Sequence, residues 1–406
     1  MKIAQVLRRF AFEEWGGTET VVWNSAQALL KLGIQSNIIA TKACSADTSE
    51  TKLDIPIDRL DYFYPCFPMT KDRKNALDKK GGDPVVPQLP QKIQNGHFDL
   101  IHLHTGGRPA QAAVAACPKL PYVMSFHGGC YDVPQNELLE MMKPTRHTFR
   151  YGRFIDYLKG WRRNLIQGAS GLICVGQNEA EIFREKHPDK KVIYLPNGVT
   201  PELFRQKSNT DIRQEIKIPQ ERKIILCVSR IDYQKDQKFA VEAISTLKKQ
   251  GKDVQLLLMG PVSAPSYFQE LKLLVSALGM ENYVTIIPGL PAGHPTLLAA
   301  YSQADYFLLP SRHEPFGIVA LEAWSAGLPV IASKVGGLDR LVEDKRTGVK
   351  FKPGDMAEFL DAYNAIQNQS LKNNIIANAT KEVNAKYTWD AIAQKLANFY
   401  ASSIET

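Results

Sequence analysis

Two glutamates, Glu314 and Glu322, stand eight positions apart in the segment 310–323, which reads PSRHEPFGIVALEA. The segment follows an apolar run at 306–309 and leads directly into a stretch with helical periodicity. A helix N-terminus at the end of a parallel strand has free amides and a positive dipole, which suits an anion. We expect the amides of residues 316–318 to point at ligand oxygens while the two carboxylates accept hydrogen bonds from a polyol. The alternative is that Glu314 is a charge at a helix N-terminus and Glu322 a solvated side chain.

A second candidate is the pair Arg230 and Lys235 in the segment 227–236, CVSRIDYQKD, which also joins a strand to a helix. A guanidinium can bind phosphate through two N–H groups, while an ammonium acts as a mobile point charge. Together they could neutralise a diphosphate. The alternative is a pair of surface cations beside a loop. Asp236 follows Lys235 and either caps the next helix or places a carboxylate near the bound phosphates.

Near the N-terminus, Gly16 and Gly17 follow the first predicted strand and precede a helix that begins at Thr18. Adjacent glycines let the backbone approach a ligand closely, although an ordinary tight turn also explains them. The sequence has neither a G-x-G-x-x-G run nor a G-x-x-x-x-G-K-[ST] loop. The usual dinucleotide and triphosphate fingerprints are therefore absent.

His127 ends another predicted strand and precedes two glycines. It could donate a hydrogen bond to a substrate oxygen, or it could be a histidine at the edge of the core that is satisfied by backbone. His102 and His104 raise the alternative of a metal site together with His127, but neither H-x-x-x-H spacing nor Cys/His clustering accompanies them. D-x-D, a common metal-diphosphate ligand pair, is also missing. We therefore predict no metal site and assign the phosphate charge to Arg, Lys and helix ends.

Short continuous apolar runs alternate with segments of helical periodicity along the whole chain, which is typical of parallel strands covered by helices on both faces. A Pro-Asn-Gly sequence at 196–198 marks the seam between two such α/β sheets. Two insertions, 62–95 and 131–161, fit this pattern poorly and are predicted to be long functional loops. The expected strands are 3–7, 37–41, 100–104, 122–127, 171–175, 192–195, 224–229, 254–260, 284–288, 306–310, 329–333 and 349–352. The expected helices are 18–32, 177–185, 236–250, 267–278, 316–326, 356–366 and 387–404.

Composition places this chain of 406 residues among globular proteins, with 44% hydrophobic residues and a net charge of +8. Its longest apolar runs are much shorter than the roughly 18 to 20 residues that span a bilayer, and no secretory signal is recognised. The six cysteines form no C-x-x-C pair and are interpreted as free thiols of a reducing compartment. We expect a cytoplasmic protein. Lys143 to Arg163 contains seven basic residues and one acidic residue, which is either a solvated helical face or a contact with an anionic membrane or lipid phosphate.

Together these motifs resemble retaining glycosyltransferase family 4, the group 1 glycosyl transferases with the GT-B fold. Glu314 and Glu322 match the E-x7-E motif of the family, and Arg230 with Lys235 matches its R-x4-K pair. The resemblance implies two Rossmann-like domains with parallel sheets that face each other across a cleft. Further matches lie at Gly16 and Gly17 and at 196–199, 335–337, 347–348 and 353–355.

The same resemblance assigns an acceptor-side domain to residues 1–196 and a nucleotide-sugar-binding domain to residues 197–386. A C-terminal helix at about 387–406 would pack back on the first domain. Arg230 and Lys235 would hold the donor diphosphate and stabilise the leaving group in place of a metal ion. The other implied roles are ribose binding by Glu322, sugar binding by Glu314 and the amides of Phe316, Gly317 and Ile318, phosphate contact at Gly16 and Gly17, and contact with the sugar near its reacting carbon by His127.

We therefore predict a metal-independent hexosyltransferase that uses a nucleotide sugar as co-substrate, needs no cofactor and acts on a saccharide or lipid-linked acceptor. UDP-glucose or a UDP-N-acetylhexosamine is the expected donor, in the synthesis of a cell-surface polysaccharide or glycolipid. The alternatives are an epimerase or phosphorylase of the same fold and a non-catalytic sugar-nucleotide-binding subunit. A nucleic-acid-binding function is not expected, because no recognisable module accompanies the basic charge.

Overall fold

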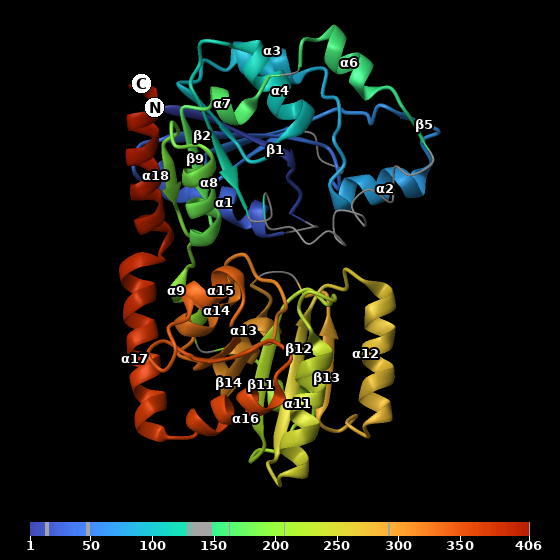
Figure 1. The fold of residues 1–406 in the computed structure, drawn as a ribbon, viewed down its shortest axis with the longest axis vertical. Helices are drawn as coiled ribbons and strands as arrows, with labels where there is room; N and C mark the ends of the chain where they lie inside the picture. The colour runs from blue at the N-terminus through green and yellow to red at the C-terminus, as the bar shows by residue number, and fades with distance from the viewer. Residues whose placement is uncertain are drawn as a thin grey trace. The chain divides into compact units, whose positions relative to one another are not determined.

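The computed structural model describes residues 1–12, 16–45, 49–127, 131, 148–161, 163–206, 208–290 and 293–405 (Figure 1). The chain divides into two compact units. Unit 1 comprises Met1–Pro196 with Ile392–Thr406, and unit 2 comprises Asn197–Ala391. Each unit has its own sheet, so the prediction of an α/β chain with two mainly parallel sheets is confirmed.

Unit 1 is built on an eight-stranded sheet in the order β10-β9-β7-β6-β1-β2-β4-β3. All neighbouring strands in it are parallel except β3 and β4, which pair in antiparallel fashion. The strands are β1 (Lys2–Arg9), β2 (Gln35–Thr41), β3 (Ser49–Lys52), β4 (Ile55–Leu60), β6 (Leu100–Leu103), β7 (Tyr122–Phe126), β9 (Gly171–Cys174) and β10 (Val192–Tyr194).

The helices of unit 1 connect these strands, and a short antiparallel pair, β5 with β8, lies outside the main sheet. The predicted strands of this half are all present, but β3 (SETK) and β4 (IPIDRL) were not predicted because neither is a continuous apolar run. These elements are α1 (Gly17–Lys31), α2 (Lys71–Lys80), α3 (Leu89–Asn95), α4 (Gly107–Ala116), α6 (Gly152–Leu158), α7 (Leu165–Gly168), α8 (Gln177–Lys186), α18 (Trp389–Ile404), β5 (Cys66–Phe67) and β8 (Phe149–Arg150).

The prediction that 62–95 is an irregular loop is wrong, because that segment contains β5, α2 and α3. Helix α2 is capped at its start by Thr70, whose side chain accepts from the backbone N–H of Arg73, and at its end by Gly81 with φ of 111°. Such caps satisfy helix-end groups without any apolar periodicity. A charged sequence such as KDRKNALDKK therefore forms a helix that its hydrophobic pattern does not reveal. Of the second insertion, 131–161, most residues lie outside the described part of the chain.

Unit 2 contains a six-stranded, wholly parallel sheet in the order β13-β12-β11-β14-β15-β16. Each of its strands agrees with a predicted one to within two residues. They are β11 (Lys223–Val228), β12 (Val254–Gly260), β13 (Val284–Pro288), β14 (Tyr306–Leu309), β15 (Val330–Ser333) and β16 (Val349–Phe351).

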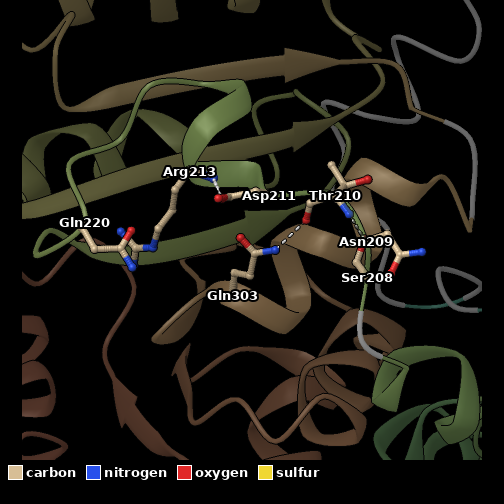
Figure 2. A pocket seen from close by; sticks show the side chains of 7 residues that line it. All are labelled: Ser208, Asn209, Thr210, Asp211, Arg213, Gln220 and Gln303. Atoms are coloured by element: carbon tan, nitrogen blue, oxygen red, sulfur yellow. Dashed lines mark hydrogen bonds between the residues drawn. The ribbon is translucent and has the colours of Figure 1, made fainter.

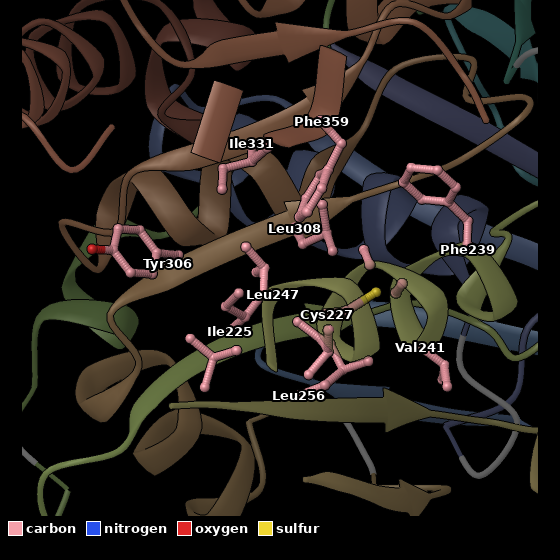
Figure 3. Close-up of a cluster of buried hydrophobic side chains, with 14 of the residues drawn as sticks. Ile225, Cys227, Phe239, Val241, Leu247, Leu256, Tyr306, Leu308, Ile331 and Phe359 are labelled. Carbon is pink, nitrogen blue, oxygen red and sulfur yellow. The ribbon is translucent and has the colours of Figure 1, made fainter. Parts of the chain in front are cut away.

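Both faces of this sheet are covered, since alternate residues of one strand enter two separate cores. Ile225 and Cys227 of β11 join one core, which Figure 3 shows with Phe239 of α11 and Phe359 of α16. The intervening Leu226 enters the other. This alternation explains why the strands read as continuous apolar runs. The helices of unit 2 are α9 (Pro201–Arg205), α10 (Ile212–Glu215), α11 (Gln237–Lys249), α12 (Pro265–Ala277), α13 (Pro295–Gln303), α14 (Ile318–Ser325), α15 (Gly336–Leu341), α16 (Met356–Ala365) and α17 (Gln369–Lys386).

The last helix, α18, belongs to unit 1 from Ile392 onward. Tyr400 is fully buried, and its hydroxyl lies 2.6 Å from Nδ1 of His102 in β6. Phe399 fills the space beside Gly171, where a Cβ would lie 2.4 Å from the phenyl ring. The end of the chain therefore completes the interior of the N-terminal unit rather than hanging free.

Candidate active site

In unit 2, the loops that follow β11 and β14 are joined to each other. The two strands are parallel neighbours in the sheet, so their carboxyl ends meet at the same edge. The backbone N–H of Arg312 donates to the carbonyl of Gln234 at 2.7 Å, and Arg312 Nε lies 2.7 Å from Asp236 Oδ2. These bonds hold the loop containing Lys235 against the loop containing Glu314.

Lys235 and Glu314, both predicted from the sequence, are in direct contact. Nζ of Lys235 lies 2.7 Å from Oε2 of Glu314, and the two side chains are only 11% and 12% exposed. A pair that is nearly removed from water is costly to desolvate, and its members attract strongly at short distance. The predicted cation and the predicted carboxylate thus share one small polar centre, in which a bound diphosphate would compete with Glu314 for the ammonium.

Asp236 does not cap helix α11 with its side chain. The residue occupies the N-cap position with φ of 47°, but its carboxylate makes no cap hydrogen bond and pairs with Arg312 instead. Arg312 was not predicted as a site residue, although it lies inside the 310–323 segment. The pairing neutralises a carboxylate that would otherwise repel an anion at this edge of the sheet.

Arg230 is more exposed than Lys235. Its side chain is 53% exposed, with Nη2 3.3 Å from Asp232 Oδ2 and 3.1 Å from Gln234 Oε1. The other carboxylate oxygen of Asp232 accepts from the backbone N–H groups of Gln234 and Lys235, which fixes the turn between the two cations. A half-exposed guanidinium beside a buried ammonium is suited to binding an anion that arrives from solvent.

The start of α14 presents free backbone donors. Gly317 occupies the N-cap position with φ of 95°, a conformation that glycine adopts without strain. Among the described residues, the N–H groups of Phe316, Gly317 and Ile318 have no hydrogen-bond acceptor. The Phe316 side chain itself is 3% exposed and packs into the core. Three free amides at the N-terminus of a helix form a positive end that favours oxygen ligands.

Two further glycines allow this loop its conformation. A Cβ on Gly336 would lie 2.6 Å from the carbonyl oxygen of Glu314, and one on Gly337 would lie 1.8 Å from that of Pro315. The N–H of Gly337 donates to the same Glu314 carbonyl at 2.9 Å. Any side chain here would displace Glu314, which gives the Val-Gly-Gly sequence at 335–337 a physical role.

Glu322 lies within α14 and is not a freely solvated side chain. The hydroxyl of Tyr301 in α13 donates to its Oε2 at 2.6 Å, and Tyr301 is fully buried. Burial raises the pKa of the Glu322 carboxyl, while the bond from Tyr301 opposes that rise. The remaining oxygen, Oε1, has no hydrogen bond within the described part of the chain. Tyr301 was not predicted, since nothing in its local sequence distinguishes it from a core aromatic residue.

In unit 1, Gly16 and Gly17 begin helix α1. Gly16 is the N-cap, and its carbonyl accepts from the backbone and side chain of Thr20. A Cβ on Gly16 would lie 2.7 Å from the end of the Glu19 side chain, whose carboxylate pairs with Arg9 at 3.1 Å. Nothing lies within 4 Å of a Cβ on Gly17. The open space therefore belongs to Gly17, which is the position where a ligand could approach the backbone.

His127 follows the last residue of β7 and contacts another histidine. Its Nε2 lies 3.0 Å from Nδ1 of His104, and the two rings stack with centroids 5.3 Å apart. Burial lowers the pKa of His127 to about 4, so the ring is neutral at pH 7. Burial and the neighbouring His102 and His127 lower the pKa of His104 well below its ordinary value. His104 and His127 are hydrogen-bonded to each other, whereas His102 is bonded to Tyr400 and Ser125. In the described part of the chain, no group of three or more metal-binding side chains is found.

A separate cavity of about 430 Å³ lies in unit 2 and is lined by none of the predicted residues (Figure 2). Its polar groups serve the fold. Gln303 Nε2 donates to the carbonyl of Thr210, Asp211 caps α10, and Arg213 donates to the carbonyls of Pro219 and Arg222. Because Gln303, Asp211 and Arg213 are engaged in these bonds and no predicted site residue lines the cavity, it is not the candidate site.

Two family models match the chain in succession. The model described as Glycosyltransferase Family 4 matches residues 15–203, and the model described as Glycosyl transferases group 1 matches residues 208–382. Their boundary falls just after the seam at Pro196. The chain belongs to the group 1 glycosyltransferases. Glycosyltransferase activity follows from this membership, and the resemblance seen in the sequence is confirmed.

Individual relatives and structures agree with the family. An uncharacterized glycosyltransferase of Methanocaldococcus jannaschii is 28% identical over 323 residues, which cover 76% of each chain. D-inositol 3-phosphate glycosyltransferase 1 of Catenulispora acidiphila is 26% identical and covers 96% of this chain and 91% of its own. Among solved structures, the sucrose-phosphate synthase of Thermosynechococcus elongatus has a TM-score of 0.73 at 23% identity, with 98% of both chains covered. HepE of Anabaena, solved with UDP and glucose, has a TM-score of 0.71 at 22% identity and covers 99% of this chain and 100% of its own. The protein therefore has the GT-B fold.

Proposed function

We propose that this group 1 glycosyltransferase transfers a hexose from a UDP-sugar to a hydroxyl acceptor with retention of anomeric configuration and without a metal ion. The single observation that carries the proposal is the joined pair of loops in unit 2. They bring together a half-exposed guanidinium, a buried ammonium and carboxylate pair, and three free amides at the start of α14. Such a set of groups suits a diphosphate attached to a sugar, because it offers both cations and donors for hydroxyl and phosphate oxygens.

In the proposed reaction, the bond between the anomeric carbon and the phosphate oxygen breaks, and a bond to the acceptor oxygen forms on the same face of the sugar. The acceptor proton passes to the leaving phosphate. Arg230 and Lys235 stabilise the charge that develops on the departing nucleoside diphosphate. Glu314 and the α14 amides hold the sugar, and Glu322 accepts hydrogen bonds from the ribose. From unit 1, we assign Gly16 and Gly17 to phosphate contact and His127 to sugar contact.

UDP-glucose is the first donor to test, since a neighbour in fold, HepE, has been solved with UDP and glucose. A panel of UDP-glucose, UDP-galactose, both UDP-N-acetylhexosamines, GDP-mannose and ADP-glucose should be incubated with the purified chain, and the release of free nucleoside diphosphate measured. We expect slow release from UDP donors, in chelator as well as in added Mg²⁺. A preference for GDP or ADP would overturn the UDP assignment, and loss of activity in chelator would overturn metal independence.

The competing functions give different products from the same panel. An epimerase would interconvert nucleotide sugars without an acceptor, whereas a phosphorylase would require free phosphate. A non-catalytic subunit would release no diphosphate from any donor, in wild type and Glu314→Ala alike. Once an acceptor is found, proton NMR of the fresh product gives the anomeric configuration, and an inverted product would refute retention.

We further propose that the acceptor belongs to a cell-surface polysaccharide or glycolipid and that unit 1 contacts an anionic membrane from the cytoplasmic side. None of the helices in the described part of the chain has the length and hydrophobicity to span a bilayer. Of the basic segment Lys143 to Arg163, residues 143–147 and Arg162 lie outside the described residues. The described remainder combines exposed cations with large exposed apolar side chains. The cations are Arg150, Arg153, Lys159 and Arg163.

The apolar side chains lie on helix α6 and on β8, whose partner strand β5 adds another. Phe67 and Phe149 are directly paired across β5 and β8 and are 69% and 73% exposed. On α6, Phe154, Tyr157 and Leu158 are 64%, 67% and 64% exposed and are spaced to share one helix face. Exposed aromatic residues flanked by cations are suited to the interface of an anionic bilayer, where each cation contributes about 1 kcal/mol.

Liposome flotation tests this surface. We expect the wild type to float with vesicles that contain anionic lipid and to remain unbound with neutral vesicles. A double substitution, Phe154→Ser with Tyr157→Ser, should weaken flotation, whereas Leu273→Ser, which removes a 70% exposed side chain of unit 2, is the matched control. Equal recovery with both kinds of vesicle would refute the membrane contact.

A further inference from the structure

Beneath His127, unit 1 contains a chain of hydrogen bonds that starts at the C-terminal helix. Gln5 of β1 is 2% exposed and lies at its centre. Its Nε2 lies 3.3 Å from the hydroxyls of both Ser36 and Tyr400, and its Oε1 lies 2.8 Å from Nε2 of His104. His104 in turn contacts His127 through its other ring nitrogen. These hydrogen bonds therefore connect four residues that are far apart in the sequence to His127, a predicted site residue.

The partners of Gln5 decide the direction of these bonds. In the observed orientation, both amide N–H groups meet a hydroxyl oxygen, and the amide oxygen meets His104. With the amide reversed, two N–H groups would face the single ring nitrogen of His104, and one would remain buried without an acceptor. An unsatisfied buried donor costs about 1 to 3 kcal/mol, so the observed orientation is favoured. His104 must then donate from Nε2 to the Gln5 oxygen.

A neutral imidazole carries one N–H proton on its two ring nitrogens, so the direction of the bond between His104 and Gln5 fixes the direction of the bond between His104 and His127. Because His104 is protonated on Nε2, its Nδ1 accepts, and Nε2 of His127 must be the donor of the 3.0 Å bond. His127 is then unprotonated on Nδ1. Within the described part of the chain, that nitrogen has no hydrogen-bond partner. The low pKa values of both rings support a neutral state for each at pH 7.

We propose that Gln5 and His104 fix His127 as its Nε2–H tautomer, so that Nδ1 is an obligatory acceptor for one hydroxyl of the donor sugar. This inference rests on the proposed use of a nucleotide sugar. It reverses the direction of the bond that the sequence suggested, in which His127 donates to a substrate oxygen. Gln5 and His104 are positioning residues, and the site selects a hexose whose hydroxyl at the contacted carbon is free to donate.

A branch of the same network offers a matched control. Nε2 of His102 lies 2.6 Å from the Ser125 hydroxyl, and its Nδ1 contacts Tyr400. Ser125 is therefore in the same polar interior but not on the path from Gln5 to His127. Ser125→Ala disturbs the network without changing which ring nitrogen of His127 carries the proton.

The tautomer can be measured directly on the full wild-type chain. Long-range proton–nitrogen NMR of the histidine side chains, assigned with His104→Gln and His127→Gln, distinguishes a protonated from an unprotonated ring nitrogen. We expect Nε2 protonated and Nδ1 unprotonated in both His104 and His127 at pH 7, and the same in Ser125→Ala. A protonated Nδ1 on His127 would overturn the proposal. This readout needs no turnover, so it stands or fails separately from the proposed glycosyltransfer.

The functional test compares UDP-glucose with its monodeoxyfluoro analogues, in which fluorine cannot donate a hydrogen bond. We expect one analogue to bind the wild type about tenfold more weakly than UDP-glucose. That difference should persist in His104→Gln, whose amide can accept from His127 and donate to Gln5, and should disappear in His104→Leu and His127→Phe. If no analogue distinguishes wild type from His127→Phe, the acceptor role is wrong. If UDP-glucose itself does not bind, the proposed donor is wrong while the tautomer result stands.

Discussion

The charged pairs of the candidate site in unit 2 lie on loops, whereas His127 in unit 1 is neutral and joins a buried network of hydrogen bonds. In unit 2, Lys235 pairs with Glu314 and Asp236 with Arg312, all within two short loops. In unit 1, His127 is joined to His104 and has its pKa lowered to about 4 by burial. Formal charge suits the binding of a diphosphate, while a neutral ring suits a single directed hydrogen bond to a sugar.

Under the proposed function, the two units would contribute different kinds of interaction to one reaction. Charges act over several ångströms and tolerate small displacements, so they can be held by loops. The strength of a hydrogen bond depends on distance and angle and falls steeply when the donor and acceptor are displaced by a fraction of an ångström. The groups that form it therefore need a rigid interior. We therefore expect substitutions in unit 2 to reduce transition-state stabilisation most, and those in unit 1 to affect orientation.

The largest effect is expected at Lys235. Replacing it with alanine removes the buried cation proposed to stabilise the leaving diphosphate, and kcat/KM should fall by roughly 10²-fold to 10³-fold. Steady-state release of nucleoside diphosphate measures the change. Lys334→Ala is the control, because Lys334 forms an exposed pair with Glu358 at 2.9 Å and should change activity little. Near-normal activity of a folded Lys235→Ala protein would show that the buried cation of unit 2 does not stabilise the leaving diphosphate.

Glu322→Gln should have the next largest effect. An amide accepts more weakly than a carboxylate, so the KM for the donor should rise on the order of tenfold while kcat changes less. Glu382→Gln, which alters a carboxylate that pairs with Arg346 and Lys386, is the control. A fall in kcat with an unchanged donor KM would show that Glu322 does not serve in donor binding.

Gly17→Ala should produce a smaller loss of donor affinity, on the order of tenfold, because a methyl group would occupy the space where the phosphate approaches. The free protein should be unaffected, since nothing lies within 4 Å of the added Cβ. Gly106→Ala is a matched control at the N-cap of α4, where the space is equally open. Titration calorimetry with UDP measures both, and equal affinities would assign Gly17 to an ordinary turn.

The smallest effect concerns stability and pH. His127 has a pKa of about 4 in the folded chain against an ordinary value of 6.5, so the unfolded chain binds more protons between these values. The contribution of the neutral His127 ring to stability is therefore fully present above about pH 6.5 and is lost as the pH falls from about 6.5 to about 4. Urea unfolding at pH 7, 6 and 5, followed by near-UV circular dichroism, should show this loss. His127→Gln should reduce the slope, with the exposed His97→Asn as control; an unchanged slope would contradict a neutral buried ring.

Much of the fold was predictable from local sequence because parallel strands are continuous apolar runs and many helices carry caps. Helix α2 was missed because its stability comes from Thr70 and Gly81 at its ends rather than from an apolar face. Strands β3 and β4 were missed because charged or polar residues interrupt any apolar run in them. In the site, Arg312 lies within a recognised motif, but its pairing with Asp236 joins two segments that are far apart in the sequence and could not be predicted. The contact between Glu322 and Tyr301 could not be predicted, because the two residues come from different helices.

By itself, the sequence determined the family and which chemical groups its motifs carry: the cations Arg230 and Lys235, the carboxylates Glu314 and Glu322, and pairs of glycines. These signals are local, because each motif joins one strand to one helix over a few residues. Only the tertiary structure decided which charged side chains pair and which ring nitrogen of His127 carries the proton. Those properties depend on contacts between residues as far apart as Gln5 and Tyr400, and only the folded interior brings such residues within hydrogen-bond distance.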